Sequence, residues 1–114
     1  MNYKLEVIAA GIDMSGSYTT DPWLMPEGTK ATVQATHEAG SGAPNGAWKL
    51  QMTLDPTLDS SQWIDVASSS QAVTAEADTV TWVLNLNCYA IRAVYTRTSG
   101  TSTGNVIGMK QIQE

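Results

Sequence analysis

The sequence predicts an all-β protein, an antiparallel β-sandwich or jelly roll of about eight short strands with little or no helix. Apolar residues alternate with polar residues at a spacing of two in several segments, and clusters of Gly, Pro, Asn, Asp and Ser separate these segments. No segment of useful length carries an apolar stripe at the 3.6-residue spacing of a helix. The same alternation fits both strand orders, so it does not distinguish a sandwich from a jelly roll.

Residues 89–97, Tyr-Ala-Ile-Arg-Ala-Val-Tyr-Thr-Arg, form the strand around which the prediction is built. The segment is rich in β-branched and aromatic residues and is bounded by turn-forming residues on both sides. Because both of its faces are largely apolar, we expect a central strand, with Arg92 paired to a carboxylate or a carbonyl. The Gly-rich segment 100–104 is expected to be a hairpin connection to the last strand.

A first strand is expected at residues 3–7, where Tyr3, Leu5 and Val7 alternate with two charged residues. Residues 12–28 are expected to form an irregular, arm-like segment, because two prolines interrupt continuous strand pairing. Trp23 and its neighbours in this arm either fold onto their own domain or lie on a partner.

The remaining strands are expected at 29–37, 48–54, 63–66, 71–74, 79–86 and 105–113. The clearest alternation is at 48–54, which predicts that Trp48, Leu50, Met52 and Leu54 point inward while Lys49, Gln51 and Thr53 point outward. Trp48 and Trp82 are in phase with aliphatic residues and are expected in the core. Trp63 is expected to cover one end of the sandwich.

Length and composition favour a single domain over residues 1–114. The net charge of −5 and the scattered basic residues argue against nucleic-acid binding, which needs clustered Lys and Arg. The amino-terminal residues lack the layout of a signal peptide, and no apolar run approaches the ~20 residues of a membrane span. We therefore expect synthesis in a cytoplasm and no membrane partner, which a single cysteine also fits.

The sequence offers no catalytic, cofactor-binding or metal-binding residues, and we expect no enzyme and no cofactor. His37 stands alone at a strand end and is interpreted as solvated, and Cys88 as a small buried hydrophobic residue. The spacing of Asp55, Asp59 and Asp65 does not match a calcium-binding loop, so these aspartates are interpreted as turn-forming residues.

Three stretches together resemble small β-sandwich proteins from tailed bacteriophages: Trp48-Lys-Leu-Gln-Met52, Asp59-Ser-Ser-Gln-Trp63-Ile-Asp-Val66, and the strand and turn from Tyr89 to Thr101. The resemblance covers about half the chain, residues 47–103. This chain has Asp59-Ser60 where the family usually has Asp-Gly.

The resemblance implies a capsid decoration (cement) protein on the outer face of the capsid. Its partner would be the major capsid protein, and self-association is implied, as a dimer or a trimer. The predicted partner-binding residues are Trp23, Leu24 and Met25 in the arm, with Tyr3 and Leu5 in the first strand. The alternative is a phage tail or fibre module that binds host-surface glycans through loops near Trp63 and residues 40–46.

Overall fold

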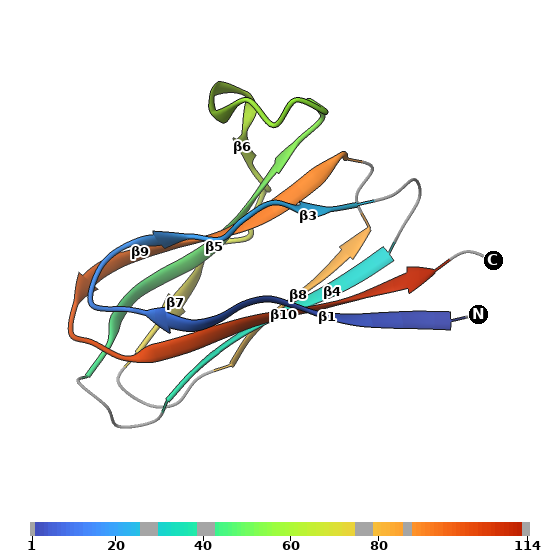
Figure 1. Cartoon of the computed structure of the whole chain (residues 1–114). Coiled ribbons are helices and arrows are strands. Elements are labelled where there is room, and N and C mark those ends of the chain that lie inside the picture. Colours follow the sequence, from blue (N-terminus) through green and yellow to red (C-terminus); the bar gives the residue numbers. More distant parts are fainter. Residues whose placement is uncertain (1, 26–29, 39–42, 75–78, 86–87, 113–114) are drawn as a thin grey trace.

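The computed structural model of the chain describes residues 2–25, 30–38, 43–74, 79–85 and 88–112. Two antiparallel sheets face each other (Figure 1). Sheet A has the order β1 (Asn2–Asp13), β10 (Thr103–Ile112), β4 (Lys30–His37), β8 (Thr79–Asn85). At the centre of sheet B lie β9 (Ala90–Ser99) and β5 (Asn45–Thr53). The short strands β2 (Tyr18–Thr19) and β3 (Trp23–Leu24) pair with β9, and β6 (Ile64–Asp65) and β7 (Gln71–Val73) pair with β5.

The strand order is that of a jelly roll. If β2 and β3 count as one strand position, and β6 and β7 as another, the sheets have the orders 1-8-3-6 and 2-7-4-5 along the chain. Apart from one turn of 3-10 helix, η1 (Ser60–Gln62), the described residues contain no helix. The predicted all-β fold is therefore confirmed, and the topology distinguishes the jelly roll from other sandwiches.

The core lies between the inner faces of the two sheets. Its largest fully buried side chains include Trp48, Tyr95, Met14 and Leu50. The rings of Trp48 and Tyr95 pack with their centroids 5.2 Å apart. Trp82 is also buried, and its indole nitrogen donates a hydrogen bond to the backbone oxygen of Ser69 (2.6 Å). Trp48 and Trp82 are thus core residues, as the alternation predicts.

Strand β9 is a central strand, as predicted, because it pairs with β5 on one side and with β2 and β3 on the other. The expected hairpin after it is wrong. Strands β9 and β10 belong to different sheets, so the connection through Gly100 crosses from sheet B to sheet A (Figure 1). Gly100 has a φ of 76°, a conformation that glycine adopts without steric cost.

The arm predicted as irregular folds back onto its own domain. Strand β1 continues to Asp13, with register shifts after Val7 and Ala9, and the chain then pairs with β9 through β2 and β3. Trp23 packs so closely on β10 that a Cβ atom at Gly108 would lie 2.6 Å from the Trp23 Cη2 atom. Residues 26–28 of the predicted arm lie outside the described residues.

Two side-chain predictions are wrong. Thr53 is buried and Leu54 is exposed, because β5 ends at Thr53 and the chain leaves the sheet there. His37 is buried at the end of β4, on the inner face that it shares with Ala35, rather than solvated.

Candidate functional site

Among the described residues, the outer face of sheet A carries four exposed large hydrophobic side chains. Val83, Leu5 and Val7 are 84%, 69% and 64% exposed, and Met109 is exposed beside them. Backbone pairing explains why they gather, since Leu5 lies opposite Met109 and Val7 opposite the half-buried Ile107. We call the outward side chains of Leu5, Val7, Val83, Ile107 and Met109 the apolar face.

The apolar face draws its side chains from β1, β10 and β8, while the outward side chains of β4, which lies between β10 and β8, are polar. Met109 pairs with Thr32, and Thr32 pairs with Val83, so one outward row runs from β1 to β8. Thr32, Val83 and Met109 also line an open depression of about 330 Å³. Exposed apolar side chains grouped on one face of a sheet are typical of protein interaction sites.

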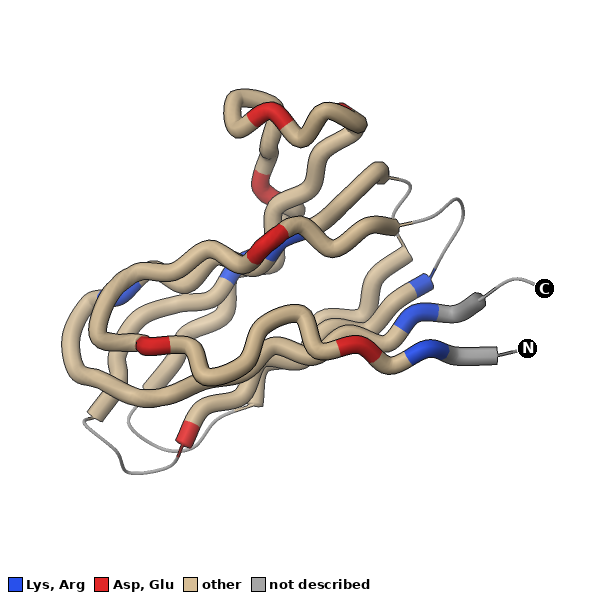
Figure 2. The backbone as a smooth tube through the Cα atoms, viewed as in Figure 1, with Lys and Arg blue, Asp and Glu red and all other residues tan. Residues whose placement is uncertain are grey.

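Charged side chains flank the apolar face at its two ends. Lys30 is the first residue of β4, near the end of the sheet where the termini lie, and Glu38 follows β4 at the opposite end, near Asp13 of β1 (Figure 2). The backbone NH of Glu38 donates to the Thr103 oxygen (3.1 Å), which extends the pairing of β4 with β10. The described outward residues between these ends are uncharged.

A second apolar surface lies at one end of sheet B, and we call it the end patch: Leu24, Leu54 and Tyr89. All three are exposed, and Leu54 is 72% exposed. They come together because Leu24 pairs with Ala90 on β9, and the backbone NH of Tyr89 donates to the Thr53 oxygen (2.9 Å). The end patch and the apolar face belong to opposite layers of the sandwich.

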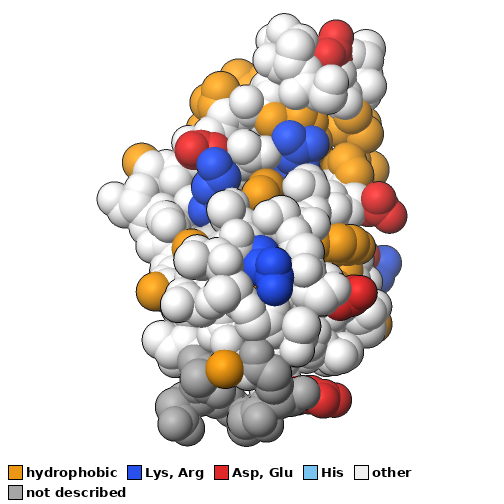
Figure 3. All heavy atoms as spheres, turned by 90° about the vertical axis from the view of Figure 1, so that its left-hand side faces the viewer, with side chains coloured by type: hydrophobic (Ala, Val, Ile, Leu, Met, Phe, Trp, Pro, Cys, Tyr) orange, Lys and Arg blue, Asp and Glu red, His pale blue; other side chains and the backbone are white. Residues whose placement is uncertain are grey.

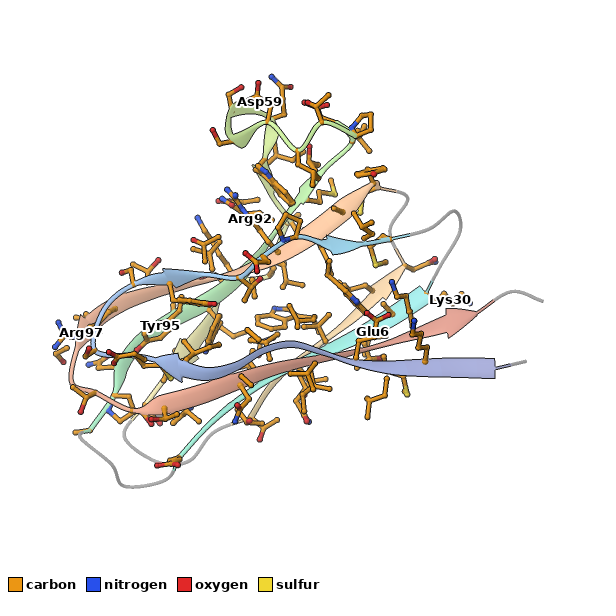
Figure 4. The ribbon with its side chains drawn as sticks, in the orientation of Figure 1. Glu6, Lys30, Asp59, Arg92, Tyr95 and Arg97 are labelled. Carbon is orange, nitrogen blue, oxygen red and sulfur yellow. The ribbon has the colours of Figure 1, made fainter. Side chains whose placement is uncertain are left out.

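The outer face of sheet B is polar. The Arg92 Nε donates to the Gln51 Oε1 (2.8 Å), and the Arg92 guanidinium lies 4.3 Å from the centre of the half-buried Trp63 ring. Gln51 in turn donates through Nε2 to Asp65 (2.9 Å), and Lys49 forms an ion pair with the same carboxylate. Figure 4 shows Arg92 on the outer side of sheet B. Of the two predicted kinds of partner for Arg92, a carboxylate or a carbonyl, the structure shows a carbonyl, the Oε1 of the Gln51 side-chain amide.

Figure 3 views the molecule from the left-hand side of Figure 1, the end where the chain passes from β9 to β10. Basic side chains gather on this face over the sheet B layer, with hydrophobic side chains above them and beside them.

The hydrogen bonds from Gln51 and Lys49 hold the pKa of Asp65 below its ordinary value. Partial burial lowers the pKa of Arg92, which nevertheless stays charged at neutral pH.

A partly buried cation, Lys110, joins the two layers near the chain termini. Lys110 donates to the Leu24 backbone oxygen (2.7 Å), lies 4.7 Å from the Trp23 ring centre and pairs with Glu6 (3.5 Å). Figure 4 shows Glu6 between the layers. Desolvation raises the pKa of Glu6, but the charge of Lys110, the interaction with the Trp23 side chain and the charge of Lys4 together outweigh it and leave this pKa below its ordinary value.

The five predicted partner-binding residues are distributed over three environments. Leu5 belongs to the apolar face and Leu24 to the end patch. Trp23 and Met25, expected as exposed anchors, are buried in the domain's own core, so in this fold they present no surface to a partner. The backbone of Tyr3 pairs with Gln111, and its side chain lies outside the described residues. Partner binding by Tyr3, Leu5 and Leu24 stays a prediction.

Sequence reasoning missed Val83, Met109 and Leu54 as interaction candidates. The signal for Val83 was present, because it occupies the outward position of a strand whose other outward residues are Thr81 and Asn85. Leu54 carried no such signal, since the alternation placed it in the core.

The possible metal ligands and reactive side chains among the described residues lie apart from one another or serve local structure. None of them form a group of three or more His, Cys, Asp and Glu side chains that could hold a metal ion. Asp55 accepts hydrogen bonds from Thr57, and Asp59 caps η1, so both aspartates shape turns as predicted. Cys88 is half-buried against the core, and burial raises the pKa of its thiol.

Across the described residues, no helix has the length and apolar character needed to cross a membrane.

No protein-family profile matches the chain, and no curated protein sequence matches it. Three solved structures share its fold. A chain of the T13 IBDV viral particle has a TM-score of 0.61 at 7% identity, covering 96% of this chain, which spans only 30% of that chain's length. The SPBc2 prophage-derived protein YomS has a TM-score of 0.55 at 12% identity, covering 96% of this chain and 92% of YomS.

The third is the N-terminal cellulose-binding domain of β-1,4-glucanase C from Cellulomonas fimi. Its TM-score is 0.53 at 14% identity, and the match covers 100% of this chain and 81% of that domain. At these identities the three similarities establish the fold alone.

Proposed function

We propose that this chain is a structural virion protein, a capsid decoration (cement) protein that binds the outer face of the major capsid protein lattice and stabilises the shell. The observation that carries the proposal is the pair of separate apolar surfaces, the apolar face on sheet A and the end patch on sheet B. A protein that ties neighbouring subunits together needs at least two contact surfaces that can be occupied at once.

The fold supports this proposal. The jelly-roll arrangement is shared with a chain of a viral particle and with a prophage-derived protein, and residues 47–103 resemble phage β-sandwich proteins. The role requires no catalysis, and we propose that the chain is no enzyme, carries no cofactor and binds neither nucleic acid nor membrane. Its place would be the capsid exterior.

Binding of this kind stabilises a shell by mass action. A ligand that binds the assembled lattice but not its dissociated subunits lowers the free energy of the assembled state, and every occupied position adds to the effect. The end patch suits such a contact because Leu24, Leu54 and Tyr89 are exposed side chains at the ends of neighbouring segments. We assign the end patch to the capsid.

Co-sedimentation with capsids that lack the chain tests the assignment. The purified chain is expected to pellet with such capsids, and Leu54→Asp is expected to weaken binding by about tenfold or more, because a desolvated carboxylate opposes burial. Thr98→Asp is the matched control, since Thr98 is exposed near the opposite end of β9. Absence of the chain from the pellet would refute the proposed function, while equal binding of the Leu54 and Thr98 variants would refute only the role of the end patch.

The second candidate function is glycan binding by a tail or fibre module. It is favoured by Trp63, which lies with Arg92, Gln51 and Asp65 on the outer face of sheet B, since an indole ring beside polar groups suits sugar recognition. The fold shared with a cellulose-binding domain agrees with this candidate. A glycan array decides between the functions: a cement protein gives no signal, whereas a glycan-binding module gives a signal that Trp63→Ala removes.

A further inference from the structure

We propose that the apolar face of sheet A is the contact surface between two copies of this chain, which pair face to face about a two-fold axis with their strands antiparallel. The resemblance already implies self-association, and this inference adds which surface the two copies share and how they are oriented. It holds whether or not the chain binds a capsid. It rests on the apolar face and on the charges at its two ends.

The apolar face is unoccupied by the chain itself. None of the described segments packs over the outward side chains of Leu5, Val7 and Val83, which remain mostly exposed. Hydrophobic side chains that are exposed together gain free energy when a second surface removes them from water, by about 25 cal/mol for each Å². Sheets also pack well face to face, with their strands roughly aligned.

The charges select a second copy as the occupant. The outward positions of β4 and the next residue are, in order, Lys30, Thr32, Gln34, Thr36 and Glu38, so a cation and an anion lie equally far from Gln34. A two-fold axis across the strands at Gln34 therefore places Lys30 of one copy opposite Glu38 of the second copy, and the reverse pair forms as well. The surface is complementary to itself.

The same axis brings apolar side chains together at the centre. Gln34 pairs with Ile107, and Ile107 pairs with Val7, so the middle row of one copy meets the middle row of the second copy through Val7 and Ile107. An alternative axis parallel to the strands and along β4 would place Lys30 opposite Lys30 and Glu38 opposite Glu38, and charge repulsion disfavours it. A strand-parallel axis between β10 and β4 would place β4 opposite β10 and leave Lys30 and Glu38 without an opposite charge.

The size of the sheet sets the expected affinity. Four strands about 4.8 Å apart, each contributing seven paired positions about 3.4 Å apart, give roughly 460 Å² per copy, or about 900 Å² in all. Specific interfaces of this size are at the weak end of the range. We therefore expect a reversible dimer with a Kd on the order of micromolar or weaker.

Sedimentation velocity of the purified chain between a few and several hundred micromolar is the primary test. The expected result is a monomer that becomes a dimer as concentration rises. Val83→Lys, at a side chain that makes almost no contact with its own domain, should raise the Kd by about tenfold or more, and Met109→Glu should do the same. Ile64→Lys is the matched control, because Ile64 is exposed on sheet B, and its Kd should be unchanged.

A charge exchange tests the orientation. Lys30→Glu alone and Glu38→Lys alone should each raise the Kd, by about threefold to tenfold, because both charge pairs of the dimer become repulsive. A mixture of the two variants should form a heterodimer with an affinity near that of the unchanged chain, since both of its charge pairs are attractive. Failure of the mixture to regain affinity would overturn the antiparallel arrangement.

A measurement without variants covers the case in which a substitution impairs folding. Amide chemical shifts that change with concentration should map to the outward rows of sheet A, including Val7, Thr81 and Ile107. The proposal is overturned if the chain stays monomeric at several hundred micromolar. It is equally overturned if a dimer forms that is unaffected by both Val83→Lys and Met109→Glu, or if the shifts that change lie on sheet B or along the free edge of β1.

Discussion

The outer faces of the two sheets differ in how many contacts their side chains make within the chain. On sheet B, Arg92, Gln51 and Asp65 form a chain of hydrogen bonds, and Trp63 lies against Arg92. On sheet A, outward side chains such as Val83 and Leu5 are mostly exposed. One face has its partners within the chain, whereas the other has apolar surface left for a partner.

The connection between β5 and β6 accounts for this difference. Residues 54–63 rise above the outer side of sheet B and bring Trp63 over Arg92 (Figure 1). No described segment covers the outer side of sheet A. Each strand of sheet A is followed or preceded along the chain by a strand of sheet B. The outer face of sheet A is thus the more apolar of the two outer faces, while the end patch leaves exposed apolar side chains at one end of sheet B.

The largest expected change in the free energy of unfolding comes from β3, where a buried residue and an exposed residue are adjacent. Trp23→Ala should lower the free energy of unfolding by about 3–5 kcal/mol, because it leaves a cavity against Gly108 and removes the ring beneath Lys110. Leu24→Ala should cost less than about 0.5 kcal/mol, since its side chain is half-exposed. Chemical denaturation measures the free energy of unfolding of both variants. Similar losses in the two variants would show that the arm does not pack on its own domain.

A smaller loss of stability is expected from a substitution on the outer face of sheet B than from Trp23→Ala, and a smaller loss still from one on the outer face of sheet A. Arg92→Ala should lower the free energy of unfolding by about 1–2 kcal/mol, through the loss of the Gln51 hydrogen bond and of the contact with Trp63. Val83→Ala, the matched change on sheet A, should alter it by less than about 0.5 kcal/mol at concentrations where the chain is monomeric.

Gln51→Ala sharpens this second comparison, because it removes the hydrogen bond and keeps the contact between Arg92 and Trp63. It should therefore cost less than Arg92→Ala. Equal or larger destabilisation by Val83→Ala would contradict the difference between the faces.

The smallest expected effect is a response to acid on the outer face of sheet B that the uncharged outward positions of sheet A lack. The pKa of Asp65 is lowered in the folded chain, so its stabilising contribution is present above the pKa of the unfolded state, near 3.9, and is lost as pH falls through the lower folded value. In an NMR titration below about pH 4, the side-chain amide of Gln51 should shift as Asp65 is protonated. The outward positions Thr81 and Ile107 should not respond, and an equal response there would contradict the contrast.

Much of the fold could be predicted from the sequence, because alternation with a period of two specifies which residues share a face of a strand. It placed Trp48 and Trp82 in the core and Arg92 on a central strand. The short strands β2 and β3 could not be predicted, since two residues carry no period and their pairing depends on β9, which is distant in the sequence.

The candidate surfaces were predictable only in part. Leu5 and Val7 share a face by alternation, but alternation does not say whether that face meets the core or the solvent. Only the pairing of β1 with β10 shows that they lie outward beside Met109 and Ile107. Leu54 was misassigned for a similar reason, because a periodic pattern does not reveal where a strand leaves its sheet.

The number of copies per particle tests the central claim most directly. Quantitative mass spectrometry of purified particles of the phage proposed to carry the chain gives this number relative to the major capsid protein. A cement protein is predicted to be present on the order of hundreds of copies per particle, because it follows the symmetry of the capsid lattice. About a dozen copies or fewer, or absence from the particle, would contradict the account.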